Sequence, residues 1–491
     1  MDIGGEHLTA GVVAFAIVAI FFGLFFEFIN GFHDTANAVA TVIYTHSLPP
    51  TGAVVWSGLW NFIGVLTSTG AVAYGIVALL PPTLVLNVAS GTGAAALFAL
   101  LLAAVIWNFG TWYLGLPCSS SHSLIGAIIG VSLTDSFLHS GRVQGMRWDQ
   151  VHNVMMSLLI SPIIGFACAA LLLILLRNFV HNDRLFQPAD PKRTPPGWIR
   201  GLLILTCTGV SFAHGSNDGQ KGMGLFMLIL IVVLPAGLAL NPNLKPNELK
   251  ALTTELDHAK QVFQGKAAGA PPLAPEEARK HLTSFNFPEA KLDANVYPAL
   301  ITETQQLQDK LQGRDRIEDI PMEDRQDQRR SVYLIQGAVQ KLVREKQVSP
   351  GEVKSLEGSL KNAIDYIPVW VKAAVAAALG LGTMIGWKRI VVTVGEKIGK
   401  SHLAYAQGAA AELTTAGTIL LADRLGLPVS TTHVLSSGIA GTMSANRSGL
   451  QKDTLRNILL AWVLTLPVCF FLGAVLFSGL LAFFFNVLGW K

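Results

Sequence analysis

Charged residues are scarce in this chain: only 14% of its 491 residues are Asp, Glu, Lys or Arg, whereas 51% are hydrophobic. An ordinary soluble protein carries about 25% charged residues. Between Glu6 and Asp135 there is no Lys or Arg, and Glu27 and Asp34 are the only acids. Such a stretch cannot cover a surface that faces water. The composition therefore excludes an ordinary soluble enzyme, a nucleic-acid-binding protein and a disordered protein, and it predicts an all-α polytopic membrane protein.

Cysteine is also scarce, and its spacing excludes two further classes. The four cysteines, at 118, 168, 207 and 469, are scattered and form no C-x-x-C pair. Neither a disulfide framework nor a structural zinc site is therefore predicted. The net charge of +4 is too small to imply a polyanionic partner.

Charge returns in one long stretch, which divides the chain. Residues 241–362 hold 18 Lys or Arg and 18 Asp or Glu, and this balance predicts a solvated, helical insert. The predicted parts are a first membrane repeat (1–177), a basic connecting loop (178–200), the start of a second membrane repeat (201–240), the hydrophilic insert (241–362) and the remainder of the second repeat (363–491). Basic short loops mark the cytoplasmic side, so 178–200 and 387–400 are predicted there, whereas the charge rule leaves the side of the long insert open.

Two short motifs occur twice. LPCSSSHSL at 116–124 matches LPVSTTHVL at 427–435, and the Gly-Asp motif at 30–38 matches that at 214–222. Each half thus combines apolar spans with a Gly-Asp break and a Pro-Ser-Ser/Thr-His break. Paired halves with interrupted segments at matched positions are typical of secondary transporters. The pattern predicts a secondary transporter with two re-entrant or broken-helix hairpins.

The Pro-Ser-Ser/Thr-His motifs are suited to binding an anion. A Pro followed by hydroxyl residues and an apolar run is typical of a helix start, where free backbone N–H groups and the positive end of the helix dipole lie. Two such starts facing each other could hold a tetrahedral oxyanion without an arginine. Helix capping alone is the alternative, but the duplication favours binding. The candidate ligands are Ser119, Ser120, Ser121, Ser430, Thr431 and Thr432.

The acids of the Gly-Asp motifs are candidates for ion coupling. A carboxylate inside a bilayer is costly and is a functional candidate by default. Asp34 with Asn37, and Asp218 with Asn217, offer oxygen ligands for Na⁺ or a carboxylate that carries a proton, and helix capping is the alternative. Lys221 takes the place that Asn37 has in the first half, so its ammonium could replace a metal ion, which favours proton coupling. Alternatively, it only neutralises Asp218 or extends to an interface.

Several further polar residues are supporting candidates. Histidines in the four motifs could relay protons or bind a metal, or could hold broken helices by hydrogen bonds. The intramembrane acids could line an ion pathway or serve helix packing. These candidates are His33, His122, His214, His433, Glu27, Gln407 and Glu412. No metal site is assigned, beyond Asp34 and Asp218 if a cation is bound.

Four stretches together resemble the inorganic phosphate transporter (PiT) family, most closely its bacterial low-affinity permeases: NGFHDTANAVATVIYT at 30–45, FAHGSNDGQKGMG at 212–224, GTMIGWKRIVVTVGEKIGK at 382–400 and LPVSTTHVLSSGIAGTM at 427–443. The resemblance implies an inverted-repeat transporter of about 10–12 membrane segments. It also implies phosphate bound by the six hydroxyl residues and a coupling cation or proton at Asp34, Asn37, Asn217 and Asp218. The chain departs from the sodium-coupled pattern at 219–221, where that signature reads valine, alanine and asparagine. The resemblance therefore implies proton symport, with phosphate carried as a neutral complex with a divalent metal.

The predicted function is import of inorganic phosphate across the bacterial inner membrane by a multi-pass proton symporter that is no enzyme and holds no cofactor. Its predicted partners are phosphate, a coupling cation and the lipid bilayer, without nucleic acid, and a homodimer is left open. Sodium-coupled symport and a sulfate permease of the same fold are the alternatives. A Ser–His hydrolase is disfavoured because G-x-S-x-G and H-E-x-x-H are absent from the sequence, and a passive channel because intramembrane acids would be unneeded.

Overall fold

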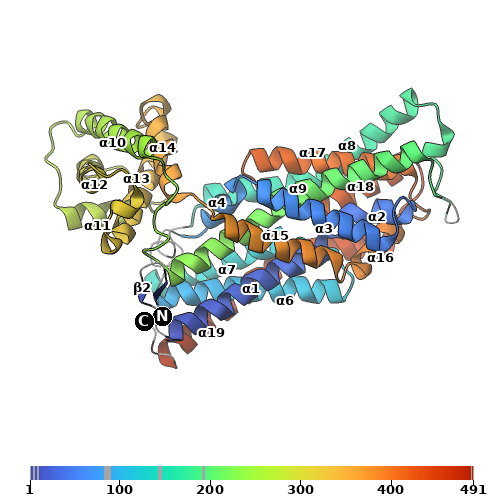
Figure 1. Cartoon of the computed structure of the whole chain (residues 1–491), viewed down its shortest axis with the longest axis horizontal. Helices are drawn as coiled ribbons and strands as arrows, with labels where there is room; N and C mark the ends of the chain where they lie inside the picture. Colours follow the sequence, from blue (N-terminus) through green and yellow to red (C-terminus); the bar gives the residue numbers. More distant parts are fainter. Residues whose placement is uncertain are drawn as a thin grey trace.

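The computed structural model describes residues 2–3, 6–7, 10–81, 84, 90–141, 146–190, 194–487 and 489. Two short strands, β1 (Asp2–Ile3) and β2 (Glu6–His7), pair near the N-terminus, and the remaining regular elements of the described chain are helices. Figure 1 shows a long helical bundle with a smaller helical body at one end. The predicted all-α membrane architecture is confirmed.

The bundle is built from two sets of helices. The first set is α1 (Ala10–Asp34), α2 (Ala36–Tyr44), α3 (Pro50–Thr67), α4 (Ala71–Val77), α6 (Gly91–Tyr113), α7 (Ser120–Ser140) and α8 (Trp148–Phe179). The second set is α9 (Gly197–Val233), α15 (Val369–Met384), α16 (Lys388–Glu396), α17 (Tyr405–Arg424), α18 (Thr431–Ala445) and α19 (Lys452–Asn486). Among the described residues, five spans are long and apolar enough to cross a membrane, counting α1 and α2 as one, and up to seven if two bent helix pairs are included. The chain is therefore a multi-pass membrane protein.

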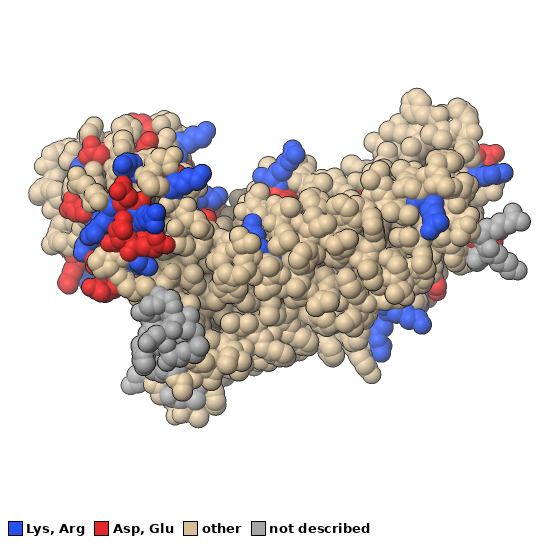
Figure 2. Space-filling view, viewed as in Figure 1, with Lys and Arg blue, Asp and Glu red and all other residues tan. Residues whose placement is uncertain are grey.

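The outer surface of the bundle is apolar. Large side chains such as Ile163 of α8, Leu205 of α9 and Val463 of α19 are exposed by 66%, 66% and 71%. In water these faces would be costly, whereas in a bilayer they contact lipid chains. Figure 2 shows the same division, since charged side chains crowd the small helical body and are sparse along the bundle.

Each half packs its helices against the other half in an equivalent way. α7 packs along α19 just as α18 packs along α8, and α1 packs on α15 as α9 packs on α3. Glycines allow these approaches, because a Cβ at Gly130 would collide with the backbone of Phe470, and a Cβ at Gly441 with that of Phe166. In Figure 1, α1 runs away from the end that carries the small body and α9 runs toward it. The matched packing and the opposite directions of α1 and α9 support the predicted inverted repeat.

The two kinds of predicted break have different outcomes. The Gly-Asp break at 214–222 is wrong, because α9 continues through it. At 30–38 the helix is interrupted only at Thr35, between α1 and α2, where the backbone keeps α-helical angles (φ −51°, ψ −38°). The glycines there serve close packing instead, since Gly31 faces the backbone of α15 and Gly215 that of α3. At the Pro-Ser-Ser/Thr-His motifs the helices do stop. Residues 114–119 separate α6 from α7, and 425–430 separate α17 from α18.

The polar segment 241–362 folds around a core of its own. Its helices are α10 (Pro246–Lys266), α11 (Pro275–Phe285), α12 (Val296–Leu311), α13 (Met322–Arg344) and α14 (Pro350–Ile364). Phe263 and Leu300 are fully buried among other apolar residues of these helices. The buried carboxylate of Glu303 accepts hydrogen bonds from the Ser331 hydroxyl at 2.5 Å and from the Arg279 guanidinium at 3.3 Å. Apolar burial and this buried polar group together give the insert a compact helical structure.

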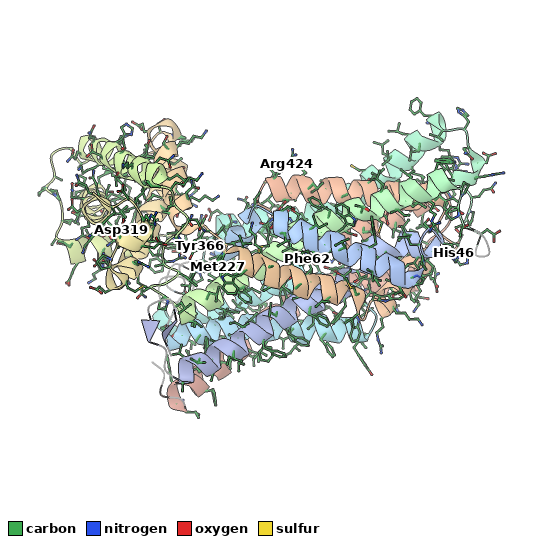
Figure 3. The ribbon with its side chains drawn as sticks, viewed as in Figure 1. His46, Phe62, Met227, Asp319, Tyr366 and Arg424 are labelled. Carbon is green, nitrogen blue, oxygen red and sulfur yellow. The ribbon has the colours of Figure 1, made fainter. Side chains whose placement is uncertain are left out.

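The insert lies at one end of the bundle and the basic connections at the other. Figure 3 shows Tyr366 at the junction with the insert and His46 at the opposite end. Arg344 of α13 pairs with Asp149 at the start of α8. The end that carries His46 (Figure 3) also holds segments 178–190, 194–200 and 387–400 (Figure 1). Lys192 and Arg193 of the predicted basic loop lie outside the described residues. If the basic end is cytoplasmic, as its charge predicts, the insert projects from the opposite face.

Candidate functional site

The two Pro-Ser-Ser/Thr-His motifs start helices in the same way. Ser119 caps α7, and its Oγ accepts a hydrogen bond from the backbone N–H of His122 at 3.2 Å. Ser430 caps α18, and its Oγ accepts from the backbone N–H of His433, also at 3.2 Å. Because the two caps match, the backbone N–H groups in the first turn of α7 and of α18 have the same orientation relative to their Pro-Ser-Ser/Thr-His motif. Each motif thus supplies a helix N-terminus inside the protein.

The other hydroxyl residues lie where the two halves meet. The Ser121 hydroxyl donates to a backbone carbonyl of the α17–α18 connection at 2.7 Å. The Asn37 amide donates to the hydroxyls of Thr431 at 3.3 Å and Thr432 at 3.1 Å. The Ser120 hydroxyl is buried and has no hydrogen-bond partner within the described part of the chain. The structure therefore brings all six predicted anion ligands to the two adjoining helix starts.

A buried cluster of two carboxylates and one imidazole adjoins these hydroxyls. Asp34 Oδ1 accepts from the Thr432 hydroxyl at 2.5 Å and lies 3.4 Å from His33 Nδ1. His214 Nε2 lies 3.6 Å from Asp34 Oδ2 and 3.6 Å from Asp218 Oδ2. Ligand atoms of Asp34, His214 and Asp218 all lie within 4.8 Å of one another. Such a set can bind a divalent metal ion or pass a proton between its members.

A lysine completes this cluster from within α9. Lys221 Nζ is fully buried and lies 2.7 Å from Asp218 Oδ2, three residues earlier on the same helix. Asn217 donates through its amide to a backbone carbonyl of the α17–α18 connection at 3.3 Å. Glu27 of α1 is also fully buried and packs directly against Gly222. The predicted coupling residues of the two halves thus converge, with a fixed positive charge on one side.

The motif histidines His122 and His433 pack against each other. Their ring centroids lie 4.6 Å apart, and the His433 ring stacks on Trp462 of α19 at 3.9 Å. The Trp462 indole N–H in turn donates to the carbonyl of Pro117 at 3.1 Å. This stack ties the α6–α7 connection, α18 and α19 together. These two histidines therefore support the helix starts, whereas His33 and His214 contact the carboxylates.

Two of the supporting candidates lie in other surroundings. Gln407 Oε1 accepts from the Ala404 backbone N–H at 2.8 Å, and its Nε2 donates to the Thr442 carbonyl at 3.3 Å, so it fixes the start of α17 against α18. Glu412 accepts from the Thr206 hydroxyl at 2.5 Å, between α17 and α9. Within the described chain, neither residue makes a hydrogen bond to the six hydroxyl residues.

Sequence reasoning missed two polar residues near the cluster, Asn61 and Asp423. Asn61 of α3 lies 2.7 Å from His214 through its Oδ1 and donates to the Thr383 hydroxyl of α15 at 3.3 Å. Asp423 of α17 accepts from the Gln220 amide at 2.5 Å. Each is an isolated polar residue outside the repeated motifs. The signal that could have identified Asn61 is its position within an apolar run, where an amide needs a buried partner.

The fold and the site define a multi-pass membrane transporter whose two halves contribute equivalent helix starts to one buried centre. A model of the "Phosphate transporter family" matches residues 30–473. The low-affinity inorganic phosphate transporter PitA of Escherichia coli (strain K12) is 43% identical, over 96% of this chain and 98% of its own. PitB of the same organism is 44% identical, over 94% and 95%. The chain therefore belongs to the phosphate transporter family, as its motifs predicted, and this family comprises transporters rather than enzymes.

More distant matches extend over the same length. A probable low-affinity inorganic phosphate transporter of Bacillus subtilis (strain 168) is 27% identical, over 94% of this chain and 95% of its own. The solved structure described as "The sodium-dependent phosphate transporter" covers 95% of this chain and 99% of its own, with a TM-score of 0.51 and 19% identity. This likeness shows that the two chains share a fold.

Proposed function

We propose that this chain imports inorganic phosphate by proton symport across the bacterial inner membrane, carrying it as a neutral complex with a divalent metal ion. Membership of the phosphate transporter family supports phosphate as the substrate. The curated relatives named above are low-affinity inorganic phosphate transporters. The six hydroxyl residues at two helix starts suit a tetrahedral anion, because N–H and O–H donors can surround its oxygens.

The observation that carries the proposal of proton coupling is the Lys221–Asp218 ion pair. Lys221 Nζ lies 2.7 Å from Asp218 Oδ2, so the ammonium group of the lysine occupies the position beside this carboxylate where a metal cation would otherwise bind. A sodium ion bound at Asp218 would be repelled by the ammonium group of Lys221. Asp34 has no lysine partner among its described contacts and lies beside His33 and His214. We assign the coupling proton to this Asp34 side of the cluster.

Protonation also distinguishes phosphate from sulfate. At neutral pH phosphate retains a proton and can donate a hydrogen bond to Asp34 or Asp218, whereas sulfate can only accept. Carboxylates next to the hydroxyls therefore favour phosphate, since a sulfate ion there would meet acceptors with nothing to donate. A divalent ion held at Asp34 and His214, rather than at the Asp218 carboxylate that Lys221 already pairs, would neutralise a doubly charged phosphate beside it. In this proposal the metal ion is transported together with phosphate and is not a permanent part of the protein.

Uptake of radiolabelled phosphate into proteoliposomes tests the coupling ion. An inward proton gradient should drive accumulation, and a protonophore should collapse it. A sodium gradient at equal pH should drive none, chelation of divalent ions should reduce the rate, and excess sulfate should leave uptake unchanged. Accumulation that follows the sodium gradient and ignores the pH gradient would overturn proton coupling. Inhibition by equimolar sulfate would favour the broader oxyanion permease.

Ser120→Ala tests the anion site. Its buried hydroxyl is free of other partners in the described chain, so it is available to phosphate, and a hydrogen bond to a charged group is worth about 1.5–3 kcal/mol. We expect the KM for phosphate to rise about tenfold or more in the proteoliposome assay. Ser437→Ala is the matched control, because that hydroxyl donates within α18 to the Val434 carbonyl at 3.0 Å. An unchanged KM in Ser120→Ala would remove this hydroxyl from the site.

A further inference from the structure

An open cavity of about 650 Å³ lies at the basic end of the bundle, between the end of α6 and the start of α16. Its size falls within the range of about 300–1,000 Å³ that small-molecule sites occupy. Aromatic and basic side chains dominate its lining: Trp112, Tyr113, Trp387, Lys388, Arg389 and Lys397. Its described lining contains no Asp or Glu. The composition indicates a site for an anion that also has an apolar part.

Hydrogen bonds fix the walls of this cavity. The Trp112 indole N–H donates to the Gly386 carbonyl at 2.8 Å, and the Thr393 hydroxyl donates to the Gly115 carbonyl at 2.8 Å. Gly386 and Gly115 adopt positive φ angles of 75° and 69°, which suit glycine and allow both turns to approach closely. The cavity is therefore a built feature that joins the two halves of the chain, rather than a gap between loosely packed helices.

Two of the three cations are available to a ligand. The Arg389 guanidinium lies over the rings of Trp112 and Tyr113, at 5.3 and 4.9 Å from their centroids. Lys388 and Lys397 are exposed, and within the described chain they make no ion pair or hydrogen bond. The neighbouring acid Glu396 is not part of the lining. The cavity thus presents two ammonium groups without a neutralising carboxylate.

Apolar side chains that line or adjoin the cavity form an exposed rim. Tyr113 and Leu114 belong to the lining, Ile385 directly precedes the lining residue Gly386, and the Phe109 ring packs on Trp112 with ring centroids 5.4 Å apart. Phe109, Leu114 and Ile385 have exposed fractions of 45%, 69% and 56%, and Tyr113 of 61%. Aromatic residues and lysines in such mixed surroundings are typical of the membrane–water interface. Figure 2 shows basic side chains where α16 lies, next to the uncharged belt of the bundle. A ligand that matches both parts is an amphiphile with an anionic headgroup.

We propose that this cavity binds the phosphate-bearing headgroup of an anionic phospholipid. Lys388 and Lys397 contact the headgroup, and the acyl chains lie along Leu114 and Ile385. Basic pockets between helices at the cytoplasmic face are suited to such lipids, and the basic end of this bundle is the predicted cytoplasmic end. Inorganic phosphate shares the headgroup chemistry but would leave the apolar rim uncovered.

The site adjoins the transport centre, because Phe32, two residues before Asp34, packs on Trp112 with ring centroids 4.8 Å apart.

Native mass spectrometry of the purified full-length protein tests this site. Phosphatidylglycerol, phosphatidylcholine and inorganic phosphate serve as separate probes. We expect phosphatidylglycerol to bind in preference to phosphatidylcholine, and millimolar inorganic phosphate not to displace it. Each basic residue near an anionic lipid strengthens association about fivefold, so Lys388→Gln/Lys397→Gln should weaken phosphatidylglycerol binding about 25-fold.

Lys452→Gln is the matched control, because this lysine is exposed at the start of α19 and does not line the cavity. Phosphate uptake by the double variant in vesicles without anionic lipid should equal that of the parent chain, which shows that the variant is folded. Equal binding of the two lipids would overturn the proposal, as would full retention of phosphatidylglycerol by the double variant. Displacement by inorganic phosphate would assign the cavity to a free anion instead.

Discussion

Asp34→Asn is expected to reduce proton-driven phosphate accumulation to the level of empty vesicles. The amide keeps the size of the side chain but can neither carry a charge nor take up a proton. In the parent chain this carboxylate accepts the Thr432 hydroxyl at 2.5 Å and lies beside His33 and His214. Radiolabelled phosphate uptake under an inward proton gradient measures the loss. Phosphate exchange without a gradient should persist, because the hydroxyl site is retained.

Asp149→Asn provides the control for Asp34→Asn. It removes a carboxylate that pairs with Arg344 between α8 and the insert, far from the buried cluster along the chain, so accumulation should continue. Equal amounts of monodisperse protein for both variants would show that the fold is intact. Normal accumulation by Asp34→Asn would exclude this carboxylate from coupling and would leave Asp218 as the remaining candidate of the pair.

Lys221→Asn is expected to have a comparable effect and to change the coupling ion. Asp218 would lose the ammonium that lies 2.7 Å away in the parent chain. Removing one member of a buried ion pair leaves an uncompensated buried charge and costs about 3–5 kcal/mol of folding stability, so the variant should be less stable and its proton-driven uptake should fall to near background. The new amide oxygen, with Asp218 and Asn217, offers hard ligands suited to Na⁺. The residual uptake should therefore depend on sodium, measured with imposed sodium gradients.

A double variant separates the role of Lys221 from simple charge balance. Asp218→Asn/Lys221→Asn leaves no unpaired charge from this ion pair, so the protein should fold as well as the parent chain. If Lys221 only neutralises Asp218, the double variant should recover proton-driven uptake. If Lys221 or Asp218 itself takes part in transport, the variant should stay inactive. Unchanged uptake by Lys221→Asn alone would contradict both the ion-pair argument and the sodium prediction.

Much of the site could be predicted because its signals are local. A helix start is encoded by a Pro and a few hydroxyl residues, so the residues around Ser119 and Ser430 are enough to predict that both belong to such starts. The repeated motif also identifies the histidines that follow. Glycine is less informative. The Gly-Asp motifs predict helix breaks, yet Gly31 and Gly215 lie in continuous helical segments, because a missing Cβ there serves contact with another helix.

Other members of the site could not be predicted, because their roles depend on distant partners. Asn61 has no motif, and its function in the cluster comes from His214, which lies more than a hundred residues later in the chain. Gln407 and Glu412 are equally plausible pathway residues in sequence. Their hydrogen-bond partners instead hold α17 against α18 and α9. A polar residue in an apolar helix signals a buried partner but does not identify it.

By itself, the sequence determined the membrane character, the duplication, the family and the residue types that can hold an anion. These follow from hydropathy and short-range helix rules, which involve neighbouring residues. Only the tertiary structure decided that α7 packs on α19 and α18 on α8, that Asp34 and Asp218 share His214, and that the insert and the basic loops lie at opposite ends. The physical reason is that helix pairing depends on the shapes of side-chain surfaces that are far apart in the chain.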